Sequence, residues 1–471
     1  MEPNIRLPAD ARKENARRLA ATTGMTVDQA DEKLDVPVVV STAENDSAAL
    51  QLAEEVIPLI SRTFTNVTTK PVSDAAVELL IGKVQPRTKG KAVYASISPE
   101  GLMISASGLE SNPRCGSPPA GLLLVISACY LCAAVVKHAT DIAYPFADPF
   151  VLDFDEFGLA PSEYLAAVDL GETHQAGAGA IGNGLMWAAR HLNIRGRLHV
   201  VDDDVVGAGN LQRQMFFLPE DEGQSKVEVL VKRVGPFLPH LTLIPHRARL
   251  QELTDDGPWL RRLISAVDSP EARRSIQKEF PGEVFDASTT GIEEVIVHHH
   301  RQPTETACMA CVYQKGAKEL SLQQHMADHL GLTLEQVLNN RINIEMAVSI
   351  AAKFPDQVVS QIEGLACDSL YKRLCGAGIL NTPAGQQILA PFAFVSVLAG
   401  ALIALELLRR IGLQDVEPFN VWRVGCWSPP TRRLWRKQGR STRCEVCGDG
   451  GLREVSRILW QDLTGVEKII P

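Results

Sequence analysis

Short apolar runs alternate with amphipathic segments along most of the chain, which is the pattern of strands that alternate with helices. In the first third, Val36–Val40 is typical of a buried strand and Ala48–Ser61 has helical spacing. Further strands are expected at three places, Ala76–Leu80, Lys91–Ile97 and Leu102–Ala106. Gly121–His138 has the composition of a buried helix. These elements predict an N-terminal α/β domain over residues 36–150, preceded by a polar arm over residues 1–35.

The same alternation continues in the rest of the chain. Helices are expected at Leu185–Leu192 and Lys226–Val234. Strands are expected at Arg197–Asp202, Leu241–His246, Leu263–Val267 and Val284–Ala287. Strand–helix alternation of this kind builds a doubly wound, mostly parallel sheet. The sequence therefore predicts an α/β fold with a Rossmann-like domain over residues 151–450 and a C-terminal tail over residues 451–471.

Two apolar runs, Gly121–Val136 and Ile388–Leu408, need comparison with membrane spans. The first is shorter than the ~20 residues that a span requires. The second contains Pro391 and is rich in alanine, serine and glycine. We expect both runs to be buried helices of an α/β core and expect no contact with a membrane.

Charge and cysteine content narrow the class of protein. The formal net charge of -9 argues against a general nucleic-acid surface. The N-terminus has no apolar segment of the kind that secretion signals carry. Ten cysteines without such a signal favour metal binding or catalysis over disulfides, and they favour a reducing, cytoplasmic compartment.

A glycine-rich loop precedes the helix expected at Leu185–Leu192. Gly177, Gly179 and Gly182 form a G-x-G-x-x-G motif, which permits a tight turn and a close approach of backbone to phosphate. This motif alone fits NAD, FAD or ATP equally. Asp202 stands 20 residues after Gly182, where an acidic residue takes the ribose hydroxyls of a nucleotide.

Further polar positions extend this pattern beyond that of a dinucleotide site. Asn210, Arg213 and Lys226 follow the loop, and their cations would neutralise the β- and γ-phosphates of a triphosphate. A dehydrogenase has no need of such cations, although surface charge is an alternative interpretation. Asp268 ends another predicted strand, where it would either hold Mg²⁺ or cap the following helix.

Two Cys-x-x-Cys pairs lie far apart in the chain: Cys308 with Cys311 and Cys444 with Cys447. Four thiolates suit a tetrahedral structural Zn²⁺ ion, and redox-active or free thiols are the alternative. Cys129 and Cys132 have the same spacing within an apolar helix, so we expect buried core cysteines there.

Cys375 is the predicted nucleophile, and Cys367 is the alternative. Both precede the second apolar helix. A reactive cysteine needs thiolate character, which nearby cations promote. Lys372 and Arg373 flank Cys375, whereas Asp368 lies beside Cys367. Ordinary packed thiols remain a third interpretation.

Three consecutive histidines, His298–His300, resemble a metal site by composition. Neighbours on a strand point to opposite faces, so three adjacent imidazoles cannot easily share one ion. We therefore expect these histidines at the surface or at a sheet edge.

The ordered string GAGAIGN, VVDDDVV, GNLQRQ, GQSKVE and AVDSPEARR resembles the ThiF/MoeB and ubiquitin-activating enzyme superfamily over residues 165–450. Members adenylate the C-terminal glycine of a ubiquitin-like or sulfur-carrier protein. The resemblance implies that Asp202 holds the ribose of ATP, that Asp268 binds Mg²⁺, and that the two Cys-x-x-Cys pairs bind Zn²⁺. It also implies that Asn210, Arg213 and Lys226 hold the phosphates. Ser269 and Gly209 depart from the residues usual in the family.

The resemblance implies that a cysteine receives the activated glycine as a thioester and passes it to a conjugating protein. The N-terminal domain lacks a glycine loop and resembles an inactive adenylation half. The resemblance implies that it forms a pseudo-dimer with the active half and supplies the contacts that smaller relatives obtain by homodimerising. Bacterial ubiquitin-like conjugation systems, some linked to antiviral defence, contain enzymes of this plan. The alternatives are a sulfur-carrier adenylyltransferase, which Pro383 at the aligned cysteine position disfavours, and an NAD-dependent oxidoreductase.

Overall fold

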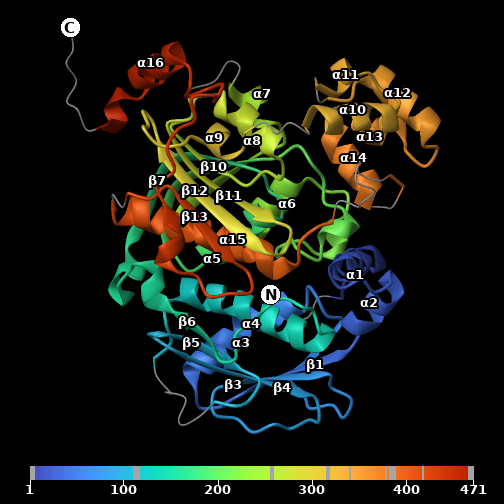
Figure 1. Cartoon of the computed structure of the whole chain (residues 1–471), viewed down its shortest axis with the longest axis vertical. Helices are drawn as coiled ribbons and strands as arrows, with labels where there is room; N and C mark the ends of the chain where they lie inside the picture. The colour runs from blue at the N-terminus through green and yellow to red at the C-terminus, as the bar shows by residue number, and fades with distance from the viewer. Residues whose placement is uncertain are drawn as a thin grey trace. The chain divides into compact units, whose positions relative to one another are not determined.

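The chain forms two compact units in a computed structural model, Met1–Tyr313 together with Pro391–Pro471 and, separately, Gln314–Ala390 (Figure 1). The structure describes residues 6–109, 117–254, 259–314, 319–338, 341–365, 367–376, 379–380, 389–415 and 418–464. The larger unit contains two sheets, and the smaller unit is helical.

The N-terminal sheet has six strands in the order β2-β1-β3-β4-β5-β6. These are β1 (Pro37–Thr42), β2 (Asn66–Thr68), β3 (Val77–Ile81), β4 (Lys91–Ser98), β5 (Gly101–Ser105) and β6 (Phe150–Asp153). The first four pair in parallel and the last two are antiparallel. The helices α3 (Ser47–Ile60) and α4 (Gly121–Thr140) pack on this sheet and on each other. The second α/β domain predicted from the sequence is therefore present.

Residues 1–35, expected as a polar arm, contain two ordered helices, α1 (Ala9–Thr23) and α2 (Val27–Leu34). Ala11, Ala16 and Leu19 of α1 are fully buried in the main core. The buried stripe of α1 consists mostly of alanine between charged residues, so its mean hydropathy is low. For this reason the hydrophobic pattern of the sequence did not predict that one face of α1 is buried.

The second sheet has eight strands in the order β14-β13-β12-β11-β10-β7-β8-β9. Its strands are β7 (Ala167–Ala176), β8 (Asn193–Val201), β9 (Leu241–His246), β10 (Arg262–Ser265), β11 (Glu283–Thr290), β12 (Glu294–Arg301), β13 (Val421–Gly425) and β14 (Trp435–Arg436). The five strands from β7 to β11 pair in parallel, and the other three are antiparallel. The predicted doubly wound, mostly parallel sheet is confirmed. Since β7 lies between β10 and β8, ligands are expected at its carboxyl end.

The helices around this sheet are α5 (Ala180–Ala189), α6 (Lys226–Val234), α7 (Leu250–Thr254), α8 (Pro270–Gln277), α9 (Met309–Val312), α15 (Ala393–Leu407) and α16 (Gly450–Leu459). Short 3₁₀ or π turns are η1 (Phe154–Phe157), η2 (Pro161–Leu165), η3 (Ala208–Asn210), η4 (Pro219–Asp221), η5 (Gly235–Phe237), η6 (Leu408–Gly412), η7 (Arg432–Leu434) and η8 (Gln461–Thr464). The helices α4, α5 and α15 pack against one another between the two sheets (Figure 1). The core is therefore continuous from one sheet to the other.

The two apolar runs form the buried helices that the sequence predicts. By length and composition α4 is able to cross a membrane, yet 89% of its most apolar window is buried inside the structure. Every residue of α15 is buried as well. Burial on all sides explains why both helices are apolar around their whole circumference.

Two glycines bring the backbones of α5 and α15 into direct contact. A Cβ atom on Gly400 would lie 2.0 Å from the amide nitrogen of Leu185, and one on Gly184 would lie 2.6 Å from the carbonyl oxygen of Ser396. Neither position has room for a side chain, so the helix that follows the glycine loop is held rigidly against the core.

The smaller unit consists of α10 (Glu319–Leu330), α11 (Leu334–Leu338), α12 (Ile344–Lys353), α13 (Val359–Ile362) and α14 (Cys367–Gly376). It has its own apolar core, which includes Leu330, Ile350, Leu370 and Leu374. In sequence this unit interrupts the larger one between α9 and α15.

The histidine triplet lies inside the second sheet, so the expectation of a surface or edge position is wrong. β12 pairs with β11 on one side and β13 on the other. His298 and His300 are 1% and 2% exposed, and the His298 ring contacts the carbonyl oxygen of Ala307 at 3.0 Å. His299 lies on the opposite face, 3.2 Å from Glu283. The place of a strand within a sheet depends on pairing between distant segments, which the local pattern does not encode.

Candidate functional site

The glycine loop joins the carboxyl end of β7 to α5, and crowding explains two of its glycines. Gly177 has φ +100°, and a Cβ there would lie 2.7 Å from the carbonyl oxygen of Ala266. A Cβ on Gly182 would lie 2.3 Å from the carbonyl oxygen of Gly177. Around Gly179, by contrast, no described atom lies within 4 Å of such a Cβ. The loop thus has open space above its centre, where α5 begins without a side-chain cap and can accept an anion.

Asp202 fixes the shape of this loop from the end of β8. Its carboxylate accepts hydrogen bonds from the backbone amides of Ala178 at 2.7 Å and Asp204 at 2.9 Å. Burial raises the pKa of the Asp202 carboxyl, and the charge of Lys226 opposes that shift. The residue that resembles the ribose ligand of the family is therefore also the residue that closes the loop.

Lys226 is the first residue of α6 and is only 6% exposed. Its ammonium group lies 2.7 Å from a carboxylate oxygen of Asp204. Burial alone would lower the pKa of Lys226, but the carboxylates of Asp204 and Asp202 outweigh burial and raise it. The site thus holds a protonated, nearly buried cation beside the glycine loop, which is an arrangement suited to a polyphosphate.

Arg213 and Asp268 belong to the same electrostatic environment. Burial lowers the pKa of Arg213, while the negative charges of Glu14 and Asp268 act in the opposite direction. Arg213 also donates a 3.0 Å hydrogen bond to the carbonyl oxygen of Gly209. Asp268 is exposed beyond the end of β10, and the cap of α8 is Ser269, whose hydroxyl accepts from the amide of Ala272 at 3.1 Å. The helix-cap alternative for Asp268 is therefore wrong.

The helix α1 brings additional charged residues to the surroundings of Arg213. It packs on η3, the turn that ends with the half-buried Asn210. Burial lowers the pKa of Arg18 to about 10, and the charges of Glu14 and Arg213 also act on this guanidinium. The sequence contains consecutive arginines, Arg17 and Arg18, in α1. The high charge of this segment favoured a solvent-exposed arm, so the sequence did not predict that it contacts the site.

Asn183, the residue that follows the glycine motif, joins the loop to the turn that carries Arg213. Its side-chain amide nitrogen donates to the carbonyl oxygens of Ala178 at 2.8 Å and Gly179 at 3.1 Å. Its side-chain oxygen accepts from the backbone amide of Phe216 at 3.1 Å. Asn183 is fully buried, so its one side chain connects the glycine loop to the turn that carries Arg213.

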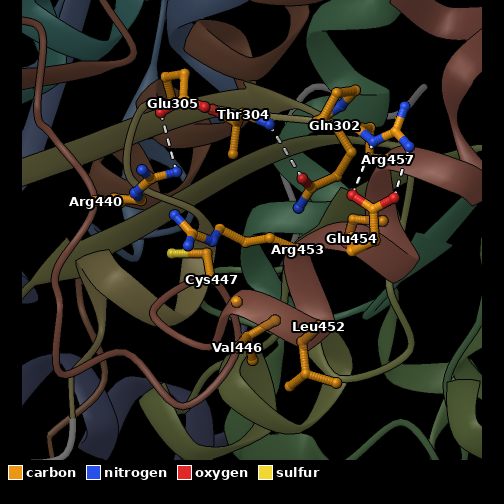
Figure 2. Close-up of a pocket in the computed structure, with 13 residues that line it drawn as sticks. Gln302, Thr304, Glu305, Arg440, Val446, Cys447, Leu452, Arg453, Glu454 and Arg457 are labelled. Atoms are coloured by element: carbon orange, nitrogen blue, oxygen red, sulfur yellow. Dashed lines mark hydrogen bonds and ion pairs between the residues drawn. The ribbon is translucent and has the colours of Figure 1, made fainter.

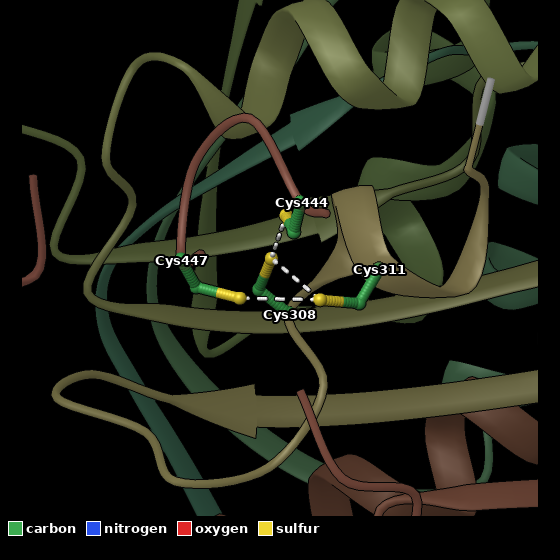
Figure 3. Close-up of side chains that lie close together, drawn as sticks. All are labelled: Cys308, Cys311, Cys444 and Cys447. Carbon is green, nitrogen blue, oxygen red and sulfur yellow. Dashed lines mark hydrogen bonds between the residues drawn. The ribbon is translucent and has the colours of Figure 1, made fainter. Parts of the chain in front are cut away.

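The two Cys-x-x-Cys pairs meet in the folded chain (Figure 3). All four sulfur atoms lie within 4.8 Å of one another. The Cys308 sulfur lies 3.8 Å from that of Cys311 and 3.7 Å from that of Cys444, and the sulfur atoms of Cys311 and Cys447 are 3.1 Å apart. Four thiolates around one Zn²⁺ ion at ~2.3 Å would be ~3.8 Å apart. The buried cluster therefore has the composition and approximate spacing of a closed metal site.

A pocket beside this cluster lies between the loop after β12 and α16 (Figure 2). Four of its charged side chains form two ion pairs: Arg440 lies 3.0 Å from Glu305, and Arg457 lies 2.6 Å from Glu454. Its lining shares Cys447 with the cluster and includes none of the nucleotide-site residues named above. We assign this pocket no part in nucleotide binding.

Cys375 and Cys367 both lie in α14, and both are fully buried in the core of the smaller unit. Burial raises the pKa of the Cys375 thiol, and a hydrogen bond with Tyr371 only partly opposes that shift. Pro383 and the side chains of Lys372 and Arg373 lie outside the described residues. The described surroundings of Cys375 are those of a packed thiol rather than of an activated thiolate.

Comparison with known proteins identifies the family. The model of the ThiF family matches residues 174–445, which is more than half of the chain, and the chain belongs to that family. The model of the E1 N-terminal domain matches residues 8–160. The first match covers the second sheet from the end of β7 onward, and the second covers the N-terminal sheet with α1.

Individual relatives are similar over parts of their length. Uncharacterized protein y4jF of Sinorhizobium fredii is 30% identical over 300 residues, which are 60% of this chain and 57% of that protein. The NEDD8-activating enzyme E1 catalytic subunit of Saccharomyces cerevisiae is 31% identical over 106 residues, 22% of this chain and 34% of that protein. The chain thus spans little more than half of the first relative and about a third of the second. The crystal structure of E. coli MccB with ATP is 16% identical and covers 76% of this chain and 98% of its own, with a TM-score of 0.39.

Proposed function

We propose that this chain activates the C-terminal glycine of a ubiquitin-like protein by ATP-dependent adenylation and then receives it as a thioester on Cys375. The observation that carries the first half is the nearly buried Lys226 beside the glycine loop, with Arg213 in the same environment. A dinucleotide site needs no such cations, whereas the transfer of a nucleotidyl group does. The family of the chain supports this choice over an NAD-dependent oxidoreductase.

In the first step a carboxylate oxygen of the carrier's C-terminus attacks the α-phosphorus of ATP. The bond from that phosphorus to the bridging oxygen breaks, and pyrophosphate leaves with the electron pair. The products are an acyl-adenylate and pyrophosphate. Lys226, Arg213 and Asn210 would stabilise the charge that develops on the phosphates.

Magnesium fits the same edge of the site. Asp268 offers an exposed carboxylate beyond the carboxyl end of β10, and its charge acts on Arg213. We propose that Asp268 holds Mg²⁺, which when bound would neutralise part of the phosphate charge.

In the second step the Cys375 thiol gives its proton to water, and the thiolate attacks the acyl carbonyl of the adenylate. AMP leaves, and the carrier remains attached through a thioester. A thiol of a conjugating protein would then displace Cys375. Because the Cys375 thiol is buried and its pKa is raised, this step requires the core of the smaller unit to open around α14.

The N-terminal domain is proposed to act as an inactive adenylation half, so that one chain supplies contacts that homodimers obtain from two. Two observations support this role. The model of the E1 N-terminal domain matches this region, and α1 brings Glu14 and Arg18 to the Arg213 side of the site.

The four-cysteine cluster is proposed to bind one structural Zn²⁺ ion. Its sulfur atoms converge, are buried and leave no position for a substrate among the four ligands. The ion would join the loop that follows β12 to the C-terminal segment.

One observation favours a second candidate function, adenylation without a cysteine intermediate or with sulfur transfer as in ThiF/MoeB-type enzymes. Both candidate cysteines are packed in the apolar core of the smaller unit. A chain of this second type would form the acyl-adenylate and pass it directly to another nucleophile.

Exchange of labelled pyrophosphate into ATP, measured with small carrier proteins that end in glycine, tests the first step. Exchange that depends on the carrier is expected, and its absence with every carrier would overturn adenylation. The Cys375→Ala variant should keep exchange and lose an adduct that hydroxylamine releases. Cys367→Ala is the matched control and should keep both. An adduct that survives in Cys375→Ala would point to another nucleophile, whereas exchange without any adduct in the wild-type chain would favour the second candidate function.

A further inference from the structure

Arg62 reaches from the N-terminal domain to the turn that carries Arg213. It follows the end of α3 and is 3% exposed. Its guanidinium donates hydrogen bonds to three main-chain carbonyl oxygens, those of Leu211 at 2.6 Å, Met215 at 2.6 Å and Phe217 at 3.0 Å. The three carbonyls lie before and after Arg213, so one side chain spans the whole turn.

The environment of Arg62 is unusual for a buried charge. Among the described residues no carboxylate forms an ion pair with Arg62, and its guanidinium hydrogen bonds go to backbone oxygens. Burial lowers the pKa of Arg62 to about 9, so its guanidinium remains protonated at neutral pH. A buried charge is tolerated only where hydrogen bonds replace its hydration. The three carbonyls must therefore stay turned toward Arg62, which restricts the backbone between them.

A hydrogen bond from α1 fixes the backbone of Arg62 in turn. The side-chain amide of Asn15, on α1, donates a 2.7 Å hydrogen bond to the carbonyl oxygen of Arg62. The same helix carries Glu14, whose charge acts on Arg213. The N-terminal domain thus contacts the turn through α1 and through Arg62. The helix α5 contacts it through the hydrogen bond from Phe216 to Asn183.

We propose that Arg62 is a positioning residue for the nucleotide site, which holds the 211–217 turn in the shape that directs Arg213 toward the phosphates of ATP. This inference rests on the proposed function for the identity of the ligand. It gives the N-terminal domain a specific part in the reaction: the domain sets the conformation of a phosphate-binding turn in the other half of the chain. Removing Arg62 should therefore weaken ATP binding without removing any atom that touches ATP.

The test uses the full chain with Arg62→Lys, Arg213→Ala and the double variant. Lysine keeps the charge but lacks the planar fork that reaches several carbonyls. The matched control is Arg262→Gln, which breaks the 2.7 Å ion pair with Glu283 between β10 and β11, at the strand ends opposite to the glycine loop. Calorimetry gives the Kd of ATP, hydrogen–deuterium exchange reports on residues 208–217, and urea unfolding shows that each variant is folded.

Arg62→Lys should raise the Kd of ATP about 10-fold and speed exchange in the 208–217 segment. Arg62→Lys should add little to the loss in Arg213→Ala, because both act on the same contact. Arg262→Gln should lower stability while the Kd of ATP stays within about twofold. An unchanged Kd in Arg62→Lys, or losses that simply multiply in the double variant, would overturn the proposal.

Failure of the proposed function would look different. A wild-type chain that does not bind ATP would overturn adenylation and, with it, the nucleotide part of the inference. Hydrogen–deuterium exchange needs neither ATP nor a carrier, so it decides separately whether Arg62 orders the turn. Unchanged exchange of residues 208–217 in Arg62→Lys would refute that part as well.

Discussion

The backbone amide of Phe216 donates a 3.1 Å hydrogen bond to the side-chain oxygen of Asn183. The nitrogen of the same side chain donates to the carbonyl oxygens of Ala178 and Gly179 in the glycine loop. Because Asn183 is fully buried, water cannot replace these hydrogen bonds. The glycine loop and the turn that carries Arg213 are therefore held in a fixed arrangement by one side chain, although more than thirty residues separate Asn183 from Phe216 in the sequence.

Replacing Asn183 by alanine should damage stability and nucleotide binding together. The change leaves the backbone amide of Phe216 and the carbonyl of Ala178 without their partner, whereas the carbonyl of Gly179 keeps its hydrogen bond from the backbone amide at position 183. The free energy of unfolding should fall by about 1–3 kcal/mol. Urea denaturation measures this loss. Asn193→Ala removes an exposed asparagine from β8 and should change neither property. Equal effects of the two substitutions would show that Asn183 does not connect the two segments.

Lys226 provides the sharpest test of the proposed phosphate contacts. Lys226→Met leaves the carboxylates of Asp202 and Asp204 without their cation, and pyrophosphate exchange should fall by about 100-fold or more. The stability should fall as well, because an uncompensated buried charge costs about 3–5 kcal/mol. Adding Asp204→Asn should recover part of the stability but none of the exchange. Recovery of exchange in that double variant would contradict a direct role for Lys226.

Metal analysis tests the cysteine cluster. The purified chain should carry one Zn²⁺ ion, and Cys444→Ser should lose most of it and unfold at a lower temperature, because a structural zinc site contributes directly to folding. Cys426→Ala also removes a buried thiol, but it lies outside the cluster, so this control should keep its zinc. A wild-type chain with far less than one ion after gentle purification would argue against the site.

Stability should decrease as the pH falls from about 6.5 to about 4. Burial lowers the pKa of His298 and of His174 to about 4, below the ordinary 6.5. Between these pH values the two histidines are protonated in the unfolded chain but remain neutral in the folded chain. Lowering the pH therefore favours unfolding. The fully buried His298 would account for up to about 3 kcal/mol. Urea denaturation at several pH values should show a flatter pH dependence for His298→Gln, and an identical slope would refute the assignment.

The elements of the second sheet and the glycine loop could be predicted because their signals are local. A buried strand, a G-x-G-x-x-G motif and a carboxylate at a strand end each lie within a few consecutive residues. The histidine triplet shows the limit of this reasoning. His298 and His300 are buried because β12 pairs on both sides, and that pairing involves β13, more than a hundred residues further along the chain.

The cysteines show the same limit in chemistry. The spacing of Cys308 with Cys311 and of Cys444 with Cys447 predicted a cluster, and the fold brings them together. For Cys375 the neighbouring cations in the sequence suggested an activated thiol, yet the fold buries its sulfur in an apolar core. The burial of a thiol depends on packing between segments that are distant in the sequence, so charged sequence neighbours are a weak guide to its environment.

The contact between Arg62 and the turn has a consequence for how this chain can vary among its relatives. Its acceptors are backbone oxygens, which every amino acid supplies, so Leu211, Met215 and Phe217 can be exchanged for other residues while the contact survives. Covariation between aligned columns would therefore not reveal it. The coupling of the two halves of this chain would be inherited through the shape of the turn rather than through matched side chains.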